Sequence, residues 1–555
     1  MSRLLIAGGT MDPRIRMMEA ENRSLERFLL PFARAQDESA SPGDNAAFRL
    51  ETPAPYYPFK ASPVRHHRPS HTAVMGLAEL ILEQEAAAVG IPSRTMGIGD
   101  LVDMNGNLKA PELFSTYGFL ALSTTYLPPA WLFFLLRSIP EKVTIFLGGP
   151  GAFKLRDAEL GRLRFSYLLR SEAEGRFRDV LRHALGETVD LEKIPGLIWR
   201  TGQRLYQSPA PPVPLELDLA PLPDFRAMAA AQGGHVLYES ARGCPFRCAF
   251  CDYPFLMGNR TFRCKGPERI FEDWRSMCEE MSVTDILCLD SLFTHPHQRL
   301  EKLCRLLSGS GLNRKVRWGC YARPNELARE ETAAMMREAG CQYVYVGFES
   351  GSRQVLRDMN KGCTVEENRK AIHQCRKAGI MTIGLFIAGF PGETGELFRE
   401  TRDFLRETAP FITSVVPWMP DFTEGTLVPV MQPEAMRRFQ LELENPSAKK
   451  VVLWRSGRFR QPLPIPWGSD WKHRGMDLQQ AWDCIDDVLT DIHEGKIHTL
   501  SEEYFLPTLL DDPLNLYRQM GEERAVAFCN GLGKRVMTGR TRDFEAWRRR
   551  VGLIR

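Results

Sequence analysis

Hydrophobic and polar residues alternate along the first part of the chain as expected for strands separated by helices. Short apolar runs at 3–8, 117–124 and 142–147 predict buried strands, and apolar residues at helical spacing over 73–89 end at Gly90. A turn of small residues follows each of the two later strands. This order is typical of a doubly wound α/β sheet, which binds its ligands at the carboxyl ends of the strands.

The pattern changes after residue 185. Residues 195–207 predict a small hairpin, and the six prolines between 209 and 223 indicate a stiff linker. We therefore expect a first domain at 1–185, followed by a hairpin and linker at 186–230.

A second α/β pattern occupies residues 231–425. Its six strand candidates lie at 236–240, 285–290, 316–323, 342–349, 380–390 and 412–418. The helix candidates between them lie near 267–281, 297–308, 326–339, 365–378 and 395–408. Six such units predict a partial (β/α)6 barrel of the TIM type, because eight units close the usual form. We expect residues 426–555 to form a mainly helical C-terminal domain that caps the site.

Composition narrows the class of protein. Of the 555 residues 43% are hydrophobic and 25% charged, which excludes a mainly disordered chain. The net charge of +3 gives no argument for a nucleic-acid or membrane partner. No apolar run approaches the roughly 18 residues of a membrane span, and the N-terminal run is too short for a signal peptide. We expect a cytoplasmic protein, monomeric by default, with neither kind of partner.

The cysteines point to metal chemistry. None of the thirteen precedes Cys244, and Cys244, Cys248 and Cys251 follow the first barrel strand as C-x3-C-x2-C. Three thiolates suit an iron–sulfur cluster or zinc. Zinc needs a fourth ligand, which Cys264 could supply, whereas three cysteines on a [4Fe–4S] cluster leave one iron open to a substrate. The other cysteines are most simply buried apolar residues.

This triplet, with Phe250 before its third cysteine and six βα units around it, resembles the radical S-adenosylmethionine (SAM) superfamily. In that family the open iron binds SAM, and the reduced cluster cleaves it to the 5′-deoxyadenosyl radical. The resemblance implies a SAM pocket in which an acidic residue contacts the ribose or amine and an arginine contacts the carboxylate. The residues implied are Phe250, Tyr253, Asp290, Arg323, Glu349, Ser350, Gly389 and Pro391.

Segments of the first domain resemble the cobalamin-binding members of that superfamily, the class B methyltransferases among them. These segments are S-T-T at 123–125, G-G-P-G at 148–151 and S-E-A-E-G at 171–175. The resemblance implies a Rossmann-like cobalamin-binding domain whose ligand is contacted by Ser123, Thr124, Thr125, Gly148, Gly149, Pro150, Gly151 and Glu172. The alternative is an α/β domain of the same shape that binds a nucleotide or nothing.

The loop R-H-H-R-P-S-H at 65–71 is expected below the cobalt. The usual D-x-H-x-x-G motif is absent, so we expect no histidine in the standard lower-ligand position. Arg68 there disfavours a cationic ligand and helps a cobalt-bound methyl group to leave as a cation. Alternatively, His66, His67 or His71 coordinates cobalt, or the loop is a solvated basic segment.

Together the resemblances imply a methyltransferase that moves a methyl group from SAM via methylcobalamin to a carbon of a natural-product intermediate, small molecule or peptide. An external reductant of the flavodoxin or ferredoxin type would supply electrons. The alternatives are a cyclase or rearrangement enzyme with the same cofactors, a cobalamin- or iron-responsive binding protein, and an RNA methylthiotransferase. Candidate residues for the substrate cavity are Trp418, Trp467, Trp471 and His473.

Overall fold

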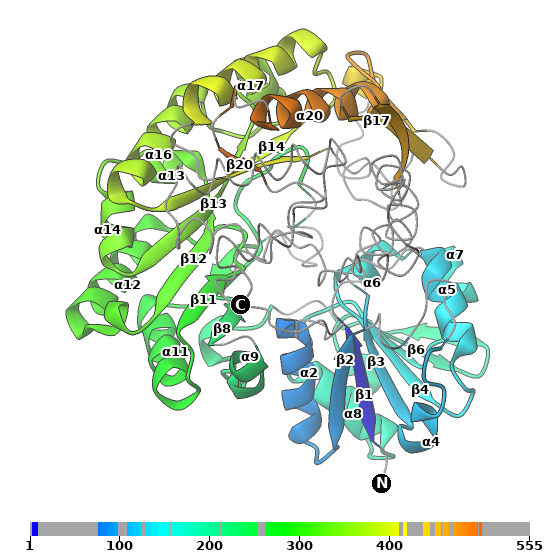
Figure 1. Cartoon of the computed structure of the whole chain (residues 1–555). Helices are drawn as coiled ribbons and strands as arrows, with labels where there is room; N and C mark the ends of the chain where they lie inside the picture. The colour runs from blue at the N-terminus through cyan, green and yellow to red at the C-terminus, as the bar shows by residue number, and fades with distance from the viewer. Residues whose placement is uncertain are drawn as a thin grey trace, which may run out of the picture. The chain divides into compact units, whose positions relative to one another are not determined.

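The structure is a computed structural model, and it describes most of the chain between residues 3 and 501. The described ranges are 3–8, 76–97, 101, 108–124, 129–155, 157–210, 214–231, 234–251, 253, 261–409, 414–418, 437–443, 450–456, 459–465, 471–493, 496–497 and 499–501. The chain divides into two compact units. Of the described residues, those up to 246 and those of 251–320 belong to the first unit, and the others to the second. Figure 1 labels helices and strands of both units.

The first unit contains a seven-stranded sheet in the order β2-β1-β3-β4-β5-β6-β7. Its strands are β1 (Leu4–Gly8), β2 (Ser93–Gly97), β3 (Phe119–Ser123), β4 (Thr144–Gly148), β5 (Tyr167–Leu169), β6 (Leu197–Thr201) and β7 (Arg204–Gln207). The first five pair in parallel, and β6 and β7 continue the sheet antiparallel. The carboxyl ends of the five parallel strands therefore meet at one edge.

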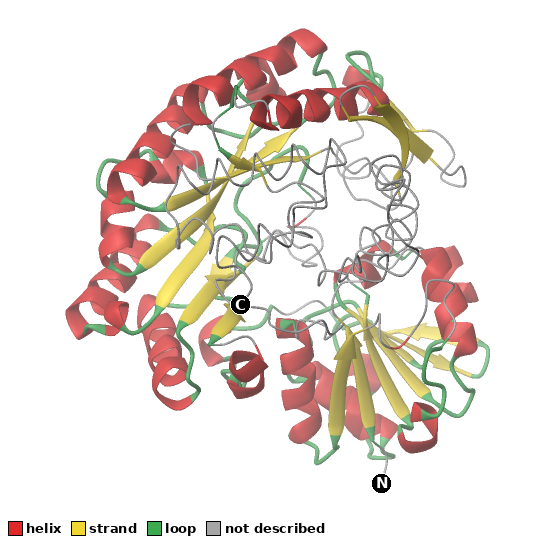
Figure 2. Cartoon of the chain, in the orientation of Figure 1, coloured by secondary structure: helices red, strands yellow, loops and turns green. Residues whose placement is uncertain are grey.

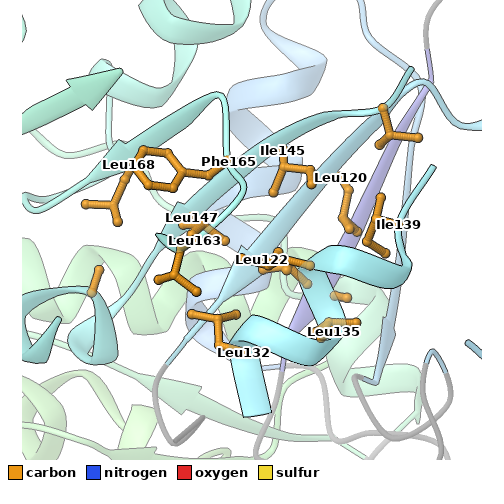
Figure 3. Close-up of a cluster of buried hydrophobic side chains, with 14 of the residues drawn as sticks. Leu120, Leu122, Leu132, Leu135, Ile139, Ile145, Leu147, Leu163, Phe165 and Leu168 are labelled. Atoms are coloured by element: carbon orange, nitrogen blue, oxygen red, sulfur yellow. The ribbon is translucent and has the colours of Figure 1, made fainter. Parts of the chain in front are cut away.

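Helices pack on both faces of this sheet. They are α2 (Leu77–Ala87), α4 (Leu113–Thr116), α5 (Pro129–Ser138), α6 (Pro150–Lys154), α7 (Asp157–Arg162) and α8 (Arg176–Ala184), with the 3-10 turn η2 (Leu191–Lys193). The turn η3 (Leu217–Leu219) and helix α9 (Arg226–Ala231) lie outside this sheet, and α9 contacts strand β8 (His235–Tyr238). Leu5 of β1 joins the cluster under α5 (Figure 3), whereas its neighbour Leu4 joins the cluster under α8. Because adjacent strand residues point to opposite faces, both faces are buried, which confirms the predicted doubly wound α/β arrangement.

Two features of this sheet differ from the sequence prediction. The hairpin predicted at 195–207 is present as β6 and β7, but it extends the first sheet beyond residue 185, where we placed the domain boundary. Strands β2 and β5 were not predicted. The sequence of β2, S-R-T-M-G, has no apolar alternation, and β5 has three residues, so neither carries a periodic signal.

All six strands predicted for the second α/β region are present. They are β8 (His235–Tyr238), β11 (Asp285–Cys288), β12 (Arg317–Ala322), β13 (Cys341–Glu349), β14 (Met381–Ile387) and β15 (Ser414–Trp418). In the first unit β11 pairs in parallel with both β8 and β12. In the second unit β14 pairs in parallel with β13 and β15, and β15 with β20 (Leu500–Ser501). The predicted βα rhythm is confirmed in each unit.

The helices of this region also follow the prediction, except at two places. They are α11 (Pro267–Glu280), α12 (His297–Ser310), α13 (Pro324–Leu327), α14 (Thr332–Glu338), α15 (Arg353–Asp358), α16 (Val365–Ala378) and α17 (Gly395–Thr408), with η4 (Leu312–Arg314) after α12. The helix predicted at 326–339 is two helices, α13 and α14, and α15 was not predicted. Gly340 and Gly379 take positive φ after α14 and α16, as expected of C-terminal caps. Figure 2 shows helices and strands alternating through this region.

The C-terminal region contains strands as well as a helix among its described residues, which differs from the mainly helical prediction. The helix is α20 (Leu478–His493), and the strands besides β20 are β16 (Glu442–Leu443), β17 (Lys450–Ser456), β18 (Phe459–Ile465) and β19 (Trp471–Lys472). Strand β18 includes Pro462 and Pro464, which exclude a helix there. In the described parts of the chain, none of the helices has the length and hydropathy needed to cross a membrane.

The loops after β3 and β4 interlock, which yields a stability prediction. The backbone N–H and the hydroxyl of Thr124 both donate to the carbonyl of Gly148 at 2.8 Å, and a Cβ on Gly151 would overlap the Thr124 carbonyl. We expect Gly151→Ala to lower the free energy of unfolding by about 1–3 kcal/mol. Gly161→Ala, in helix α7 with open space around it, is the control and should raise stability by about 0.5–1 kcal/mol. Urea denaturation of both variants, followed by circular dichroism, tests this; equal stabilities would contradict it.

Candidate active site

The cysteine loop begins at a two-residue strand. Strand β9 (Ala241–Arg242) pairs antiparallel with β10 (Arg263–Cys264), and Cys244 follows β9 after Gly243. Gly243 has φ +80°, and a Cβ there would lie 2.5 Å from the carbonyl oxygen of Thr261. The hydroxyl of Ser291 donates to the Gly243 carbonyl at 2.9 Å. Gly243 therefore permits the close turn that leads the chain into the cysteines.

Asp290 holds the chain just before that turn. Its buried carboxylate accepts the backbone N–H groups of Ser240 at 2.6 Å and Ala241 at 2.9 Å, and also the hydroxyl of Ser240. The guanidinium of Arg299 lies 3.6 Å away and forms an ion pair with it. The sequence placed Asp290 in the SAM pocket. Its described contacts instead orient the segment that enters the cysteine loop, and contact with SAM stays a prediction.

The middle cysteine of the motif lies beside a cation. Arg323, which follows β12, donates from Nη1 to Sγ of buried Cys248 at 3.3 Å. A guanidinium at this distance compensates the negative charge that a thiolate carries when it binds iron. The family resemblance implies that Arg323 contacts the carboxylate of SAM. That contact stays a prediction, and the described contact of Arg323 is with Cys248.

A second buried ion pair lies at the end of β13. Lys361 Nζ is 2.7 Å from Glu349 Oε1, and both side chains are less than a tenth exposed. Burial lowers the pKa of Lys361, but Glu349 and Cys248 outweigh this effect, so its pKa is raised and the ammonium keeps its charge. Glu349 has φ +62°, which is rare for a residue other than glycine. The family resemblance indicated Glu349 as a residue of the SAM pocket but did not indicate Lys361, although this lysine lies in the M-x-K-G segment that follows.

Ser350, the next predicted residue, is engaged inside the fold. Its hydroxyl lies 2.8 Å from the hydroxyl of Thr401 in α17, and its carbonyl accepts the side-chain amide of Asn368 at 3.3 Å. The same amide donates to the carbonyl of Phe348 at 3.1 Å. These contacts fix the turn that holds Glu349.

The loop after β14 contacts the C-terminal region. Gly389 donates its N–H to the buried carboxylate of Glu393 at 2.7 Å, and burial raises the pKa of Glu393 to about 8. His473 Nδ1 accepts the N–H of Gly392 at 3.2 Å, and its Nε2 lies 3.3 Å from the Gly389 carbonyl. Burial lowers the pKa of His473 to about 4, so this imidazole is neutral at pH 7.

The aromatic candidates in this region have structural contacts. Trp471 stacks on His473 with ring centroids 5.4 Å apart, and a Cβ on Gly389 would lie 2.6 Å from the Trp471 ring. Both side chains are buried against the loop that contains Gly389 and the buried Pro391. Their described contacts hold this loop, and a part in a substrate cavity stays a prediction.

The predicted cobalamin-binding segments lie at the carboxyl edge of the first sheet. Ser123 ends β3, Gly148 ends β4, Gly149 has φ +85°, and Pro150 begins α6. Ser123 and Thr124 are buried. Small residues at this edge let the backbone approach a flat ligand closely, so these segments fit a corrin.

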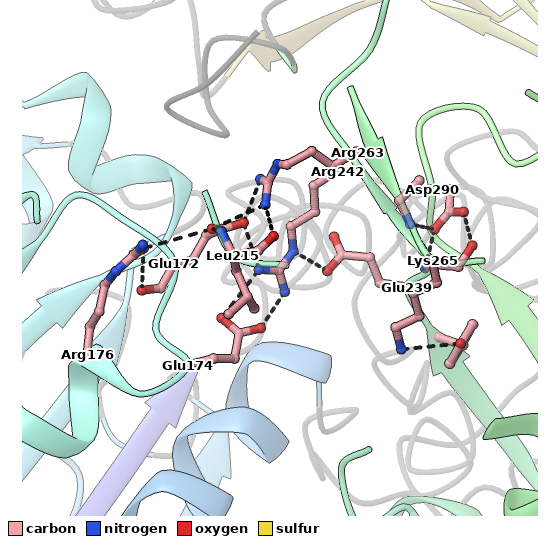
Figure 4. A network of polar contacts seen from close by, with 12 residues as sticks. Glu172, Glu174, Arg176, Leu215, Glu239, Arg242, Arg263, Lys265 and Asp290 are labelled. Carbon is pink, nitrogen blue, oxygen red and sulfur yellow. Dashed lines mark hydrogen bonds and ion pairs between the residues drawn. The ribbon is translucent and has the colours of Figure 1, made fainter. Parts of the chain in front are cut away.

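Glu172 lies in a polar network rather than in an open turn (Figure 4). Its carboxylate contacts Arg263 at 2.7 Å and Arg242 at 3.0 Å, and it accepts the N–H of Leu215 at 2.7 Å. Arg242 also pairs with Glu174 and Glu239. Since Arg242 stands two residues before Cys244, the network ties the turn after β5 to the start of the cysteine loop. Charged residues that flank the cysteine motif could have signalled Arg242 and Arg263, which sequence analysis missed.

The remaining candidates have these positions. Lys361 lies 5.5 Å from the ring centroid of Phe250. Burial, and then Glu239 and Asp290, raise the pKa of Tyr253 well above its ordinary value. Strand β15 contains Trp418, whose side chain is not described. Six of the candidate residues lie outside the described ranges: Arg68, His66, His67, His71, Thr125 and Trp467.

The described residues contain no group of three or more His, Cys, Asp or Glu side chains close enough to share one metal ion. Each cysteine that binds a [4Fe–4S] cluster contacts a different iron. The thiolates around a cluster therefore lie further apart than the ligands of a single metal ion. The three cysteines of the motif, with the cation on Cys248, fit such a cluster by their chemistry.

Glu172 yields a prediction of pH dependence. Burial raises the pKa of Glu172, but Arg263 and Arg242 outweigh this effect, so its pKa lies below the ordinary 4.5. A carboxylate of this kind stabilises the fold above its unfolded-state pKa, and the effect is lost as the pH falls through the folded-state pKa. At pH 7 we expect Glu172→Gln to lower the free energy of unfolding by about 2–3 kcal/mol. The difference from wild type should shrink below pH 4.5.

Denaturant unfolding of the wild type and the variant over a series of pH values measures this difference. Glu187→Gln is the control, because its side chain is 58% exposed and 3.9 Å from Arg182, and its effect should stay within about 0.5 kcal/mol. A difference for Glu172→Gln that does not vary with pH would contradict the prediction.

Comparison with known proteins agrees with this geometry. Residues 238–405 match the model of the radical SAM superfamily. An uncharacterised methyltransferase of Pyrococcus horikoshii is 29% identical over 270 residues, which are 47% of this chain and 57% of that protein. The anaerobic magnesium-protoporphyrin IX monomethyl ester cyclase of Cereibacter sphaeroides is 32% identical over 163 residues, or 29% of this chain and 26% of that enzyme. The matches thus span little more than half of the first relative and about a quarter of the second.

A solved structure is similar over most of the chain. The radical SAM methyltransferase TsrM of Kitasatospora setae, with cobalamin and a [4Fe–4S] cluster bound, has a TM-score of 0.60 at 15% identity. The alignment covers 96% of this chain and 100% of TsrM. The likeness shows a shared fold. We conclude that residues 238–405 form a radical SAM domain, in a chain whose fold is similar to that of TsrM.

Proposed function

We propose that the protein is a cobalamin-dependent radical SAM methyltransferase that moves a methyl group from SAM to a carbon of a small molecule or peptide. One observation carries this proposal: a single chain combines a C-x3-C-x2-C loop, with Arg323 on its middle cysteine, and a separate doubly wound sheet edged by small residues. A radical SAM domain alone does not need a doubly wound sheet of this kind. An edge of this kind is where α/β sheets bind flat cofactors.

In this proposal Cys244, Cys248 and Cys251 hold a [4Fe–4S] cluster with one open iron. The cluster would supply one electron to the sulfonium group of SAM, and cobalamin would supply a cobalt centre that carries the methyl group. An external reductant of the flavodoxin or ferredoxin type reduces the cluster.

The chain's own residues bind and orient these groups. Glu349, held by Lys361, presents a fixed carboxylate at the end of β13, where it would accept hydrogen bonds from SAM. Gly389 and Pro391 shape the neighbouring loop, which Glu393 and His473 fasten. The segments at 123–125 and 148–151 would hold the corrin, and Arg68 would be the residue that acts on the cobalt centre.

We infer a biosynthetic substrate, an intermediate of a natural product. A cyclase or rearrangement without net methylation is the second candidate. The observation that favours it is the 32% identity to a magnesium-protoporphyrin ester cyclase within the matched 163 residues.

The products formed from SAM separate the two candidates. We expect the anaerobically reconstituted protein, supplied with hydroxocobalamin, SAM and a strong reductant, to bind about four irons per chain and to form S-adenosylhomocysteine. Mass spectrometry quantifies this product together with 5′-deoxyadenosine. Adenosylhomocysteine, with or without deoxyadenosine, supports the methyltransferase. Deoxyadenosine alone would favour the cyclase.

Paired cysteine variants control this experiment. Cys248→Ser should lose iron and both products, because serine does not replace a thiolate on iron. Cys278→Ser, in α11 outside the motif, should keep them. Equal iron contents in the two variants would contradict the assignment of the cluster.

A further inference from the structure

The segment Met359–Lys361, which follows helix α15, contacts the cysteine loop at three points. The Met359 carbonyl accepts the N–H of Ala249 at 2.7 Å, and the side-chain amide of Asn360 donates to the Arg247 carbonyl at 2.9 Å. The ammonium of Lys361 lies 5.5 Å from the ring centroid of Phe250, within the range of a cation–π contact. Ala249 and Phe250 are the two residues between Cys248 and Cys251, so this segment fixes the centre of the motif.

The backbone of the segment is itself constrained. Asn360 has φ +50°, and the N–H of Lys361 donates to the carbonyl of Leu356 at 3.1 Å. Met359 and Ala249 belong to one buried apolar cluster with Phe390 and Phe439. The lysine therefore begins from a fixed backbone position.

The side chain of Lys361 is enclosed, and a close glycine accommodates its partner. A Cβ on Gly347 would overlap Glu349 Oε1 and would lie 2.8 Å from Lys361 Nζ. A buried ion pair pays a large desolvation cost and often adds little stability compared with apolar side chains. The feature that needs a reason is therefore the place of this ion pair next to the cysteine loop, where Lys361 contacts Phe250.

That place suggests an electrostatic reason. The guanidinium of Arg323 contacts Cys248 at 3.3 Å, and the ammonium of Lys361 lies 5.5 Å from the ring centroid of Phe250, two residues after Cys248. Reduction of a cluster adds a negative charge, which nearby cations stabilise and nearby anions oppose. Lys361 and Glu349 would therefore act on the cluster with opposite signs.

We propose that Lys361 is a positioning residue that holds Glu349 in place and, with Arg323, compensates the charge at the Cys248 side of the cluster. The inference rests on the proposed function, because it requires the three cysteines to bind a cluster.

The reduction potential and SAM affinity of the full-length, reconstituted protein test this inference. In Lys361→Met we expect a more negative midpoint potential, measured without SAM by redox titration followed by electron paramagnetic resonance. Its dissociation constant for SAM should rise by about tenfold, as expected when a charge-assisted hydrogen bond that orients Glu349 is lost. Lys361→Arg keeps the charge and should restore most of the potential. Lys370→Gln, an exposed lysine of α16, is the control and should match wild type in both measurements.

Glu349→Gln tests the same pair from the other side, including the case in which Lys361→Met does not fold. Removal of the anion should shift the potential in the positive direction, whereas damage to the loop has no reason to reverse sign between the two variants. Wild-type potentials in both variants, or shifts of the same sign, would overturn the inference. A wild-type protein that binds no iron would overturn the proposed function first, and this inference with it.

Discussion

The cysteine loop depends on a buried carboxylate. Strand β9 has two residues and pairs with a partner of equal length, so its ladder alone cannot fix the start of the loop. Asp290 adds hydrogen bonds to the N–H groups of Ser240 and Ala241, and Arg299 balances its charge. Hydrogen bonds to a charged acceptor in a dry interior are among the stronger ones available to a fold. The first strand of the radical SAM domain thus enters the motif in a direction set by its neighbour β11.

The same principle recurs along the loop. Arg242 is held by Glu172, Glu174 and Glu239, and Lys361 is held by Glu349. Both of these cations thus have an acidic partner from another element of their unit. Buried ion pairs of this kind favour one arrangement over others more than they favour folding itself. In this protein they determine where the cysteines lie, which apolar packing alone would leave loosely specified.

The sequence predicted the regular elements well, because periodicity is a local signal. All six strands of the radical SAM region appear, and α16 has the predicted bounds and a capping box of Thr364 and Glu367. Strand β2 was missed because it is polar, and α13 and α14 were merged because one amphipathic pattern runs through both. The C-terminal region is predicted as mainly helical, but its described residues also form strands β17 and β18, in segments that contain valines and prolines.

The sequence predicts the cysteines of the proposed site but only some of the residues around them. Family motifs located Glu349 and Glu172, but not Lys361 or Arg242, which hold them. Arg242 lies 70 positions from Glu172 in the chain, and no sequence period reports a pairing at that separation.

The motif residues can therefore be found from the sequence, whereas their partners are found only from the fold. The C-x3-C-x2-C motif indicates which groups are proposed to bind iron. The residues that orient these groups come from β11, β12 and the segment after α15, and they become visible only when the fold brings them to the loop. The groups proposed to bind the cluster lie in one short segment, whereas the residues that orient this segment come from several parts of the domain.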